Sequence, residues 1–464
     1  MNEPLVMRGR PPVGSPQVEV AVVGAGACGL TAALMLSDGK VDCVVLERDA
    51  QPCGSTALSS GFIPAPGTRV QRALGVSDSP QQLAADIQAK SNGTGAKHLA
   101  VAYSEAIGPA LDALQERHGL EWHVLNDFLY PGHSVWRMHA VPEKTGAGLM
   151  ARLQNATSRA QLPVLTQALV CHLWLDGDDH ITGVSYQRPD GSIEHLGCQA
   201  LLLACNGFGG NAQMVREWLP EVSQAIFAGH IGNDGSAIAW GRAINARLAD
   251  LGGYQGHGSW AVPHGVLVTW ALMMEGGVQV NLEGRRFHDE TLGYSEAAVQ
   301  VLAQPGGVVW NVFDEELLAF AREFPDFRQA ESAGAVKQCA DEHALAALIG
   351  CEDHQLQATL DSLEPGRVGP FGRVFTRQLQ SPFYAIRVTG ALFHTQGGLD
   401  IDAHCRVIRQ DGSPFANLLA AGGAARGVSG NAVWGYLSGN GLLSAVAGGY
   451  IAAHTIAAKL GRLK

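Results

Sequence analysis

The strongest constraint in this sequence is a glycine-rich turn that joins an apolar run to an alanine-rich run near the N-terminus. Residues 18–23 (VEVAVV) predict a buried strand, residues 31–37 predict a helix, and the turn between them has the spacing GxGxxG. Glycines at these positions allow a tight turn, a close approach of the backbone to a pyrophosphate at the helix N-terminus, and close packing of the helix on the strand. The three glycines are Gly24, Gly26 and Gly29.

An acidic residue at the end of the next strand strengthens this interpretation. Residues 41–46 predict that strand, and Glu47 follows 18 residues after Gly29. A carboxylate there can accept hydrogen bonds from ribose hydroxyls, so the strand, turn, helix and strand together predict a dinucleotide-binding unit. The alternative is a glycine turn in an ordinary α/β domain.

Two later apolar runs also end in glycine. Residues 199–210 (QALLLACNGFGG) and 417–423 (NLLAAGG) each predict a buried parallel strand that opens into a loop. The spacing GxGxxA at 207–212 resembles a second dinucleotide-binding motif, but no strand ending in a carboxylate follows it at the needed distance. We therefore expect these strand ends to face the first dinucleotide, together with the glycine-rich start of an apolar helix over residues 441–460.

Composition limits the class of protein further. The chain has 464 residues, 46% of them apolar, which is enough to bury a core in two or three structural units. Its formal charge of −11, without a basic run, argues against a nucleic acid or an anionic membrane surface as partner. The apolar runs are shorter than the about 20 residues of a spanning helix, so no membrane span is expected. Nine cysteines stand singly and no metal-ligand motif such as HExxH appears, so we expect a reducing cytoplasm and no metal.

The distribution of glycine-ended strands and charged helices divides the chain into a nucleotide-binding part and an insertion. The middle of the chain has few glycine-ended strands and more charged helices, predicted over residues 313–323 and 341–348. We expect a flexible tail over 1–16, a nucleotide-binding domain in two parts over 17–235 and 381–464, and an inserted α+β domain over 236–380.

These segments together resemble the FAD-dependent fumarate reductase and succinate dehydrogenase flavoprotein superfamily, and the active site most resembles that of 3-ketosteroid dehydrogenases. The resemblance covers nearly the whole chain. It implies an α/β fold with a Rossmann-like FAD-binding domain of the GR2 type and an inserted α+β capping domain, with substrate between the cap and the isoalloxazine ring. The motifs are GAGACGL at 24–30, Glu47-Arg48, GSTALSSGF at 54–62, LLLACNGFGGN at 201–211, GNDGSAIAWGRAINARLADL at 232–251, GRRFHDE at 284–290, FHTQGGLDID at 393–402 and SGNGL at 438–442.

The resemblance also implies which residues bind FAD. In the membrane-bound succinate dehydrogenases a histidine near the GST segment is linked covalently to flavin, and Ser55 holds that place here, which predicts noncovalent FAD. The positions that match FAD contacts of the family are Gly24, Gly26, Ala27, Cys28, Gly29, Glu47, Arg48, Ser55, Thr56, Ser60, Gly61, Val170, Ala204, Gly207, Asn233, Asp234, Gly422, Gly423, Ser438, Gly439, Asn440 and Leu442.

Two departures from the fumarate reductase pattern bear on the substrate. Those enzymes have an arginine proton donor at the end of an FDxxxR segment of the cap, and a second arginine before GGN that grips the substrate carboxylate. Here Leu318 ends the first segment, and Tyr436 stands before Leu437-Ser-Gly-Asn. An aliphatic side chain cannot deliver a proton, and a phenol cannot pair bidentately with a carboxylate, so a dicarboxylate substrate is disfavoured.

The resemblance to ketosteroid dehydrogenases gives the tyrosines a role. Tyr294, four residues after Glu290, resembles the tyrosine base of that family. Tyr436 resembles the tyrosine that binds the substrate carbonyl together with a backbone N–H, here that of Gly439. A donor on the carbonyl acidifies the α-hydrogens, so a phenolate can remove the α-proton while flavin N5 accepts the β-hydrogen as hydride. His394 matches a family histidine that holds a substrate oxygen. The alternative for both tyrosines is core packing.

Further residues are candidates for supporting roles. A free tyrosine has a pKa near 10, so the base needs an activating partner, for which Tyr103 and Tyr130 are candidates. His257 lies near a second histidine position of the family. Within GRRFHDE, Arg285 and Glu290 are expected to form a structural ion pair.

The sequence therefore predicts an FAD-dependent dehydrogenase acting on a CH–CH group (EC 1.3 type), which desaturates the α,β bond of a cyclic ketone, a 3-ketosteroid or a smaller cyclohexanone. The same site run in reverse would be an ene reductase. The alternative enzyme resembles fumarate reductase or tricarballylate dehydrogenase, with His394 and arginines such as Arg426 holding carboxylates. A flavoprotein that only relays electrons would not need paired tyrosines. The sequence does not indicate the external electron acceptor.

Overall fold

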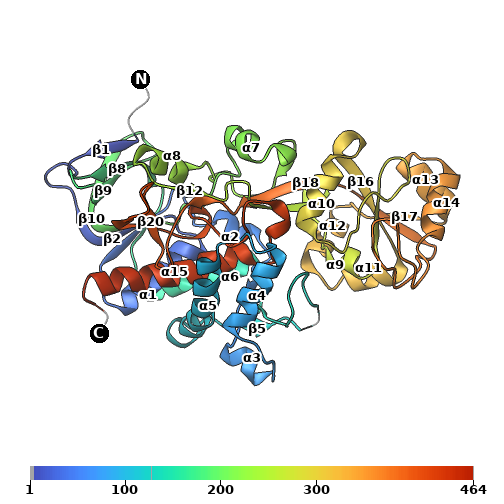
Figure 1. The fold of residues 1–464 in the computed structure, drawn as a ribbon, viewed down its shortest axis with the longest axis horizontal. Coiled ribbons are helices and arrows are strands. Elements are labelled where there is room, and N and C mark those ends of the chain that lie inside the picture. The colour runs from blue at the N-terminus through green and yellow to red at the C-terminus, as the bar shows by residue number, and fades with distance from the viewer. Residues whose placement is uncertain (1–4, 127, 463–464) are drawn as a thin grey trace. The chain divides into compact units, whose positions relative to one another are not determined.

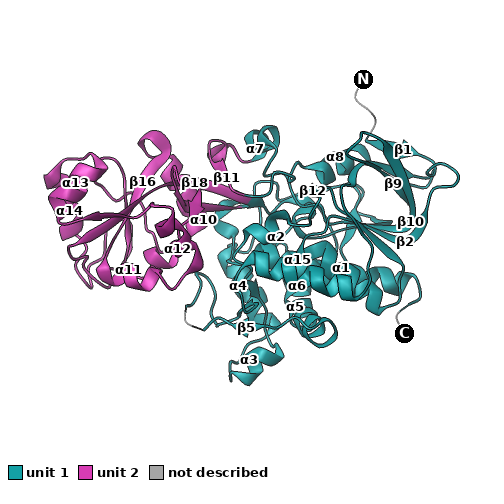
Figure 2. Ribbon diagram, turned by 180° about the vertical axis from the view of Figure 1, so that it is seen from behind, with its two compact units in different colours: residues 1–218, 229–254, 394–464 teal, residues 219–228, 255–393 magenta. Residues whose placement is uncertain are grey.

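The computed structural model describes residues 5–126 and 128–462, and the chain divides into two compact units (Figure 2). Unit 1 comprises residues 1–218, 229–254 and 394–464, and unit 2 comprises residues 219–228 and 255–393. The sequence predicts the insertion over 236–380, whereas the longer segment of unit 2 runs over 255–393 and a short segment over 219–228 joins it. The reason is that residues 236–254 add helix α8 (Ser236–Ala243) and strand β12 (Leu248–Ala249) to unit 1.

Unit 1 is built on a nine-stranded sheet whose centre is parallel (Figure 1). Strand β2 (Gln17–Val23) lies between β10 (Ile193–Leu203) and β3 (Cys43–Leu46). β7 (Val164–Leu165) extends the sheet beyond β3, and β21 (Pro414–Ala420) pairs with β10. All of these pairs are parallel, so the carboxyl ends of β2, β3, β10 and β21 meet at one edge, where α/β proteins bind ligands.

The same sheet continues into an antiparallel extension that includes residues near the N-terminus. β8 (Leu169–Leu175) pairs with β9 (Ile181–Gln187), which pairs with the first half of β10. β1 (Val6–Arg8) adds to β8 in parallel. The prediction of a flexible tail over 1–16 is therefore wrong at Val6–Arg8. The backbone groups at the edge of β8 offer hydrogen-bond partners that the polar composition of this segment does not reveal.

Helices cover this sheet. α1 (Ala27–Asp38) packs against α15 (Asn440–Lys459), α15 packs against α5 (Lys97–His118), and α6 (Gly146–Arg159) packs against α1. Among the described helices, α15 alone is long and apolar enough to cross a membrane by length and composition. Its most apolar window is 56% buried, because it packs against α1 and α5 as a core helix of unit 1.

The remaining elements of unit 1 are short. β4, β6 and β5 form a three-stranded antiparallel sheet, β20 pairs with β21, and β12 pairs with β19. Their bounds are α2 (Gly54–Leu58), β4 (Ile63–Pro64), α3 (Arg69–Ala73), α4 (Pro80–Lys90), β5 (His123–Val124), β6 (Met138–Ala140), α7 (Ala212–Trp218), β19 (Gly398–Leu399), β20 (Arg406–Ile408), η3 (Gly422–Ala424) and η4 (Val433–Gly435).

Unit 2 is built on a seven-stranded mixed sheet in which β18 is central. The strand order is β14 (Val266–Leu267), β13 (Tyr254–Ala261), β18 (Phe383–Thr395), β16 (Val308–Asp314) and β15 (Val278–Val280), and β11 (Ile226–Phe227) and β17 (Lys337–Cys339) also pair with β18. The helical elements are η1 (Pro220–Val222), α9 (Ala271–Met274), α10 (Tyr294–Leu302), η2 (Pro305–Gly307), α11 (Glu315–Ala321), α12 (Pro325–Ser332), α13 (Glu342–Ile349) and α14 (Asp353–Asp361).

The two helices predicted in this unit have different outcomes. The helix predicted over 341–348 is α13. The helix predicted over 313–323 begins only at Glu315, because Phe313 and Asp314 end β16 and pair with β18. The Asp314 side chain accepts a hydrogen bond from the Leu317 N–H at 3.1 Å and so caps α11.

Candidate active site

The turn after β2 has the shape that a bound pyrophosphate needs. Gly24 has a φ of +105°, and a Cβ built on it would lie 2.5 Å from the Ala204 carbonyl oxygen. A Cβ on Gly29 would lie 1.9 Å from the Gly24 carbonyl oxygen, so α1 packs on the turn more closely than alanine permits. Gly26 is different, since the nearest heavy atom to its Cβ position is Thr56 Oγ1 at 3.6 Å. The position beside Gly26 at the start of α1 is therefore open, which fits phosphate oxygens at a helix N-terminus.

Strand β3 delivers two charged side chains to the same edge. The buried Glu47 carboxylate accepts hydrogen bonds from the Ala25 N–H at 2.8 Å and the Asp49 N–H at 2.9 Å. These bonds fix the carboxylate and leave lone pairs for ribose hydroxyls. Arg48 pairs with Asp234 at 3.0 Å. The two predicted positions, Arg48 and Asp234, are thus brought together by an ion pair.

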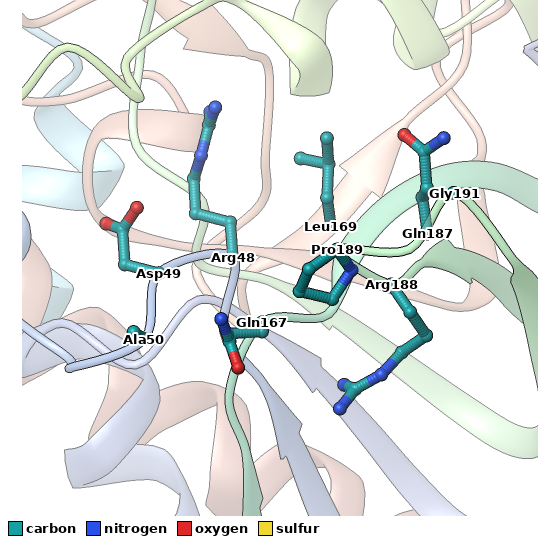
Figure 3. A pocket seen from close by; sticks show the side chains of 9 residues that line it. All are labelled: Arg48, Asp49, Ala50, Gln167, Leu169, Gln187, Arg188, Pro189 and Gly191. Atoms are coloured by element: carbon teal, nitrogen blue, oxygen red, sulfur yellow. The ribbon is translucent and has the colours of Figure 1, made fainter.

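A recess of 390 Å³ lies beside these residues (Figure 3). It is formed by the loop after β3, the start of β8 and the loop after β9, and Val170 follows one of its lining residues in β8. The mixture of apolar, amide and guanidinium groups in its wall fits the adenosine end of FAD. The lining residues are Arg48, Asp49, Ala50, Gln167, Leu169, Gln187, Arg188, Pro189 and Gly191.

Ser55 is held in place by two amide side chains. Its Oγ accepts hydrogen bonds from Nδ2 of Asn206 and Nδ2 of Asn233, both at 3.0 Å. The neighbouring Thr56 Oγ1 accepts from the Ala27 N–H at 3.2 Å, at the start of α1. The hydroxyls of α2 are thereby oriented toward the loops after β2 and β10. Noncovalent binding of FAD stays a prediction.

The start of α15 combines a strained backbone position with an unpaired acceptor. Gly439 has a φ of +85°, and a Cβ on it would lie 2.6 Å from Pro64 Cδ, so only glycine fits. Asn440 is fully buried, and within the described residues its Oδ1 has no hydrogen-bond partner. A buried acceptor without a partner is costly in an empty protein, so it fits the polar edge of a bound flavin.

The other glycines expected at FAD also lie where backbones approach closely. A Cβ on Gly61 would lie 2.7 Å from the Thr145 carbonyl, and one on Gly423 would lie 2.2 Å from Asn206 Oδ1. All residues predicted to bind FAD belong to unit 1. The remaining predicted FAD-binding residues in this unit are Cys28, Ser60, Gly207, Gly422, Ser438 and Leu442.

His394 and Tyr436 lie together in unit 1. Their ring centroids are 5.6 Å apart, with the rings edge to face at 71°. Nε2 of His394 faces the first turn of α15, where a Cβ on Gly441 would approach it to 2.8 Å. Burial lowers the pKa of His394 to about 4, so the imidazole is neutral at pH 7. Gly439 belongs to the same unit. Three of the four predicted catalytic residues, namely His394, Tyr436 and Gly439, therefore lie in unit 1.

Tyr294 begins α10 in unit 2, and its ring stacks on that of His257. The two centroids are 4.9 Å apart and the planes differ by 19°. Phe393 stacks on His257 at 5.6 Å, and Trp270 meets it edge-on at 5.8 Å. Burial lowers the pKa of His257 to about 3, and its Nδ1 accepts from the Ser259 N–H at 3.1 Å. The His257 ring is therefore neutral with its proton on Nε2, and three aromatic rings, those of Tyr294, Phe393 and Trp270, pack against it.

The two tyrosines considered as activating partners of Tyr294 belong to unit 1, and that role stays a prediction for both. Tyr103 is fully buried in α5 of unit 1, and burial raises the pKa of its phenol well above the usual value. Tyr130, also in unit 1, packs edge-on against Phe62 at 6.0 Å and Phe128 at 4.9 Å. Within unit 2 the His257 ring stacks on Tyr294, and no sequence spacing links these two positions.

Glu290 is the centre of a buried ion-pair network in unit 2. Its carboxylate accepts from Arg286 Nε at 2.9 Å and from Arg373 Nη1 at 2.8 Å, and the Gln279 N–H donates to it at 3.1 Å. The prediction that Arg285 pairs with Glu290 is wrong, since the Arg285 side chain is exposed and lies 3.9 Å from Glu283. Arg286 and Glu290 share the buried side of the segment, whereas residue 285 points outward.

Of the positions that bear on a dicarboxylate substrate, Leu318, at the proton-donor position, is apolar, and Arg426, considered for holding a carboxylate, is already paired. Leu318 is 3% exposed and belongs to the apolar core of unit 2. Arg426 donates to Asp250 at 2.6 Å through Nε and to Asp400 at 3.4 Å through Nη1. Releasing this guanidinium would leave two partly buried carboxylates without a cation.

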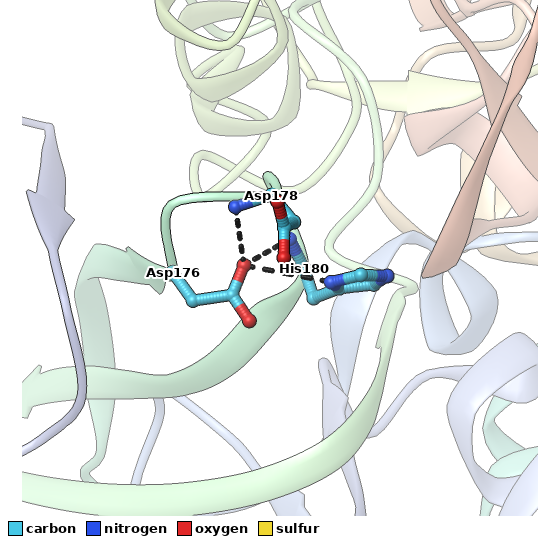
Figure 4. Close-up of side chains that lie close together, drawn as sticks. All are labelled: Asp176, Asp178 and His180. Carbon is cyan, nitrogen blue, oxygen red and sulfur yellow. Dashed lines mark hydrogen bonds and ion pairs between the residues drawn. The ribbon is translucent and has the colours of Figure 1, made fainter.

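Three side chains of kinds that can bind a metal gather at the turn between β8 and β9 (Figure 4). Asp176 Oδ1 accepts hydrogen bonds from the N–H groups of Asp178 at 3.0 Å and His180 at 2.9 Å. The His180 ring lies 3.5 Å from the same oxygen, and Asp178 is exposed. These bonds are those of a turn stabilised by an aspartate side chain, and they account for the cluster.

A family profile described as an FAD binding domain matches residues 19–442, which is most of the chain. This match decides the family. The chain belongs to the FAD-binding domain family. The residues that fit a pyrophosphate, a ribose and a flavin edge all lie within the matched region.

Known relatives of this FAD-binding protein act on different substrates. The NADH:fumarate oxidoreductase of Klebsiella pneumoniae is 26% identical over 95% of the chain, which spans about half (47%) of that relative's length. The 4-oxocyclohex-2-ene-1-carboxylate 5-dehydrogenase of Sinomonas cyclohexanicum is 22% identical over 95% of the chain and 93% of its own length. The solved 3-ketosteroid-Δ4-(5α)-dehydrogenase of Rhodococcus jostii RHA1 has the same fold, with a TM-score of 0.76 and 20% identity. The match covers 97% of this chain and 100% of that one.

The contrast among the glycines of the first turn leads to a prediction about FAD binding. Gly26→Ala is expected to weaken FAD binding by roughly tenfold or more, because its Cβ enters the position that phosphate would fill. The apoprotein should keep its melting temperature, since Gly26 has an ordinary φ of −76° and no atom closer than 3.6 Å. The absorbance ratio of flavin to protein after gel filtration measures the effect. Gly177→Ala, at an open exposed turn, is the control, and full FAD retention by Gly26→Ala would contradict the placement.

Proposed function

We propose that this protein is an FAD-dependent dehydrogenase that desaturates the α,β C–C bond of a cyclic ketone. The observation that carries the proposal is the stacking of the Tyr294 ring on the neutral His257 ring. A neutral substrate ring can lie against such a surface without the desolvation cost of a carboxylate. We further propose a cytoplasmic location, with which nine free thiols agree.

The proposed roles of the residues follow from their chemistry. Tyr436 and the Gly439 N–H donate to the carbonyl oxygen, which stabilises enolate charge as it develops. Tyr294, as phenolate, accepts the α-proton. Its place at the first residue of α10 favours the negative charge, because the helix N-terminus carries a partial positive charge. Bound FAD supplies the acceptor for the β-hydrogen as hydride.

His394 and His257 fit as neutral hydrogen-bond donors in this scheme. With pKa values lowered to about 4 and about 3, neither ring carries a positive charge at pH 7. A neutral imidazole can donate one hydrogen bond to a ketone oxygen but pairs poorly with two carboxylates. The charge state therefore favours a ketone over a dicarboxylate.

A second candidate is an oxidoreductase of di- or tricarboxylates, or the ene-reductase reaction at the same site. The similarity to the Klebsiella fumarate oxidoreductase favours it. The similarity to the Sinomonas dehydrogenase, which extends over 93% of that protein, favours a ring ketone. Arg426 is already paired with Asp250, and Leu318 lies in an apolar core. Both observations weigh against a di- or tricarboxylate substrate.

Anaerobic bleaching of the flavin absorbance separates these candidates. The holoprotein is mixed with cyclohexanone, 4-oxocyclohexanecarboxylate, a 3-ketosteroid, succinate or tricarballylate. We expect bleaching by at least one ring ketone and none by succinate or tricarballylate. Bleaching by the two acyclic acids alone would contradict the proposal, as would no bleaching by any compound in the panel.

A further inference from the structure

Three buried polar side chains connect His394 to the start of α15. Asn440 Nδ2 donates to Ser429 Oγ at 3.1 Å, and Ser429 Oγ donates to Gln396 Oε1 at 2.9 Å. Gln396 Nε2 lies 3.3 Å from His394 Nδ1. Gln396, Ser429 and Asn440 are 4%, 1% and 0% exposed, so water does not compete for these bonds. We call these three residues the amide relay.

The backbone holds the middle of the amide relay from two sides. The Gln396 N–H donates to the Gly253 carbonyl and the Gly427 N–H donates to the Gln396 carbonyl, both at 2.7 Å. A Cβ on Gly427 would lie 2.8 Å from Gln396 Oε1, so the glycine leaves room for this amide. The amide is therefore placed by the fold and has little freedom to move away from His394.

The direction of the bonds along the relay decides what His394 Nδ1 meets. A hydroxyl donates one hydrogen bond, so Ser429 cannot donate to both amides. With Asn440 as donor to Ser429, the Gln396 oxygen is occupied and its NH₂ group faces Nδ1. In the opposite direction the Gln396 oxygen would face Nδ1, and an NH₂ group of Asn440 would be buried without a partner. The direction from Asn440 through Ser429 to Gln396 instead leaves Asn440 Oδ1 as the atom without a partner among the described residues.

A competing acceptor lies at the same ring nitrogen. The Thr395 carbonyl oxygen is also 3.3 Å from His394 Nδ1 and can accept a proton carried there. The two partners favour opposite tautomers, since the Gln396 NH₂ group needs an unprotonated Nδ1. The neutral ring has one proton, which goes to Nε2 or to Nδ1.

We infer that the amide relay keeps the ring proton of His394 on Nε2, so that Gln396, Ser429 and Asn440 are positioning residues of the active site. Nε2 is the atom that faces the first turn of α15, and the relay makes it a donor. Its use on a ketone oxygen rests on the proposed function, whereas the tautomer itself does not. The free Asn440 oxygen ties the relay to the same turn that is expected to meet the flavin.

Histidine nitrogen NMR of the FAD-loaded protein without substrate tests the inference. The protein is labelled with ¹⁵N-histidine, and the His394 signals are assigned by their loss in His394→Gln. We expect the Nε2–H pattern in the wild type at pH 7. Gln396→Glu replaces the donor by a carboxylate that accepts from Nδ1–H, so the Nδ1–H pattern is expected. Ser429→Ala breaks the relay with a smaller change, and a mixture of both tautomers is expected.

A matched control separates the relay from general packing. Ser444→Ala removes a buried hydroxyl of α15 that is not part of the relay. Its Oγ lies 2.9 Å and 3.1 Å from two backbone carbonyl oxygens, and its loss should leave the Nε2–H pattern unchanged. The inference fails if the wild type shows Nδ1–H, or if both relay variants keep the wild-type pattern. Turnover of the ketone found by bleaching is measured in parallel, and the relay variants should lower kcat/KM by about tenfold to a hundredfold. A tautomer change without an effect on turnover would retain the relay and count against the role proposed for His394.

Discussion

Tyr294→Phe is expected to abolish ketone-dependent bleaching of the flavin, lowering its rate by about a thousandfold, while the protein stays folded and yellow. The hydroxyl is the group proposed to accept the α-proton, and general-base catalysis contributes about 10² to 10⁴ in rate. Phenylalanine keeps the stacked ring that lies 4.9 Å from His257. Stopped-flow absorbance under anaerobic conditions measures the rate, and flavin content with a melting curve reports the fold.

A second tyrosine of unit 2 provides a matched control for this experiment. Tyr384 is 7% exposed on β18, and its hydroxyl donates to Glu315. Tyr384→Phe therefore removes a hydroxyl from the same unit without touching the proposed base, and turnover should change less than about threefold. If Tyr294→Phe keeps the wild-type rate, Tyr294 is a packing residue, as the simpler interpretation of the sequence allows.

The largest expected effect on stability comes from Glu290→Gln. The substitution keeps the shape of the side chain but leaves the guanidiniums of Arg286 and Arg373 buried without their carboxylate. Breaking a buried ion pair from one side costs about 3–5 kcal/mol, so the urea midpoint of unit 2 should fall accordingly. Glu331→Gln breaks an exposed pair with Arg322 and is expected to cost less than about 1 kcal/mol. If both substitutions lowered the free energy of unfolding equally, the buried ion pairs of Glu290 would be worth no more than the exposed pair of Glu331.

The same carboxylate predicts how stability depends on pH. Burial alone would raise the pKa of Glu290, but Arg286 and Arg373 outweigh it and hold the pKa at about 2. An unfolded glutamate has a pKa of about 4.3, so the unfolded chain binds the proton first as pH falls. The contribution of Glu290 is therefore complete above about pH 5 and is lost progressively down to about pH 2. In Glu290→Gln this part of the acid destabilisation should be missing.

The elements of the nucleotide-binding part could be predicted because their determinants are local. The glycines after β2 and the apolar periodicity of β10, β21 and α15 are each fixed within about twenty residues of sequence. The errors occurred where distant segments decide the structure. Val6–Arg8 becomes a strand because β8 offers an edge, and Phe313 belongs to a strand because β18 pairs with it.

The candidate site divides in the same way. Tyr294, Tyr436 and His394 could be named from motifs, because each stands next to residues with a recognisable pattern. Their partners could not, since the His257 ring reaches Tyr294 from 37 positions away in the chain, and Arg373 reaches Glu290 from 83. No motif contains Ser429, which enters the site only through hydrogen bonds to Gln396 and Asn440.

Strand β18 sets a limit on how the gene for this protein can change in length. Phe393 and His394 are adjacent on this strand, and the first stacks on His257 in unit 2 while the second meets Tyr436 in unit 1. Side chains alternate between the two faces of a strand, so inserting or deleting one codon between the residues paired with β16 and His394 would turn each of the two rings to the opposite face of the strand. Insertions and deletions should therefore be tolerated in the loops of each unit long before they are tolerated in β18, even where every individual residue of that strand accepts substitution.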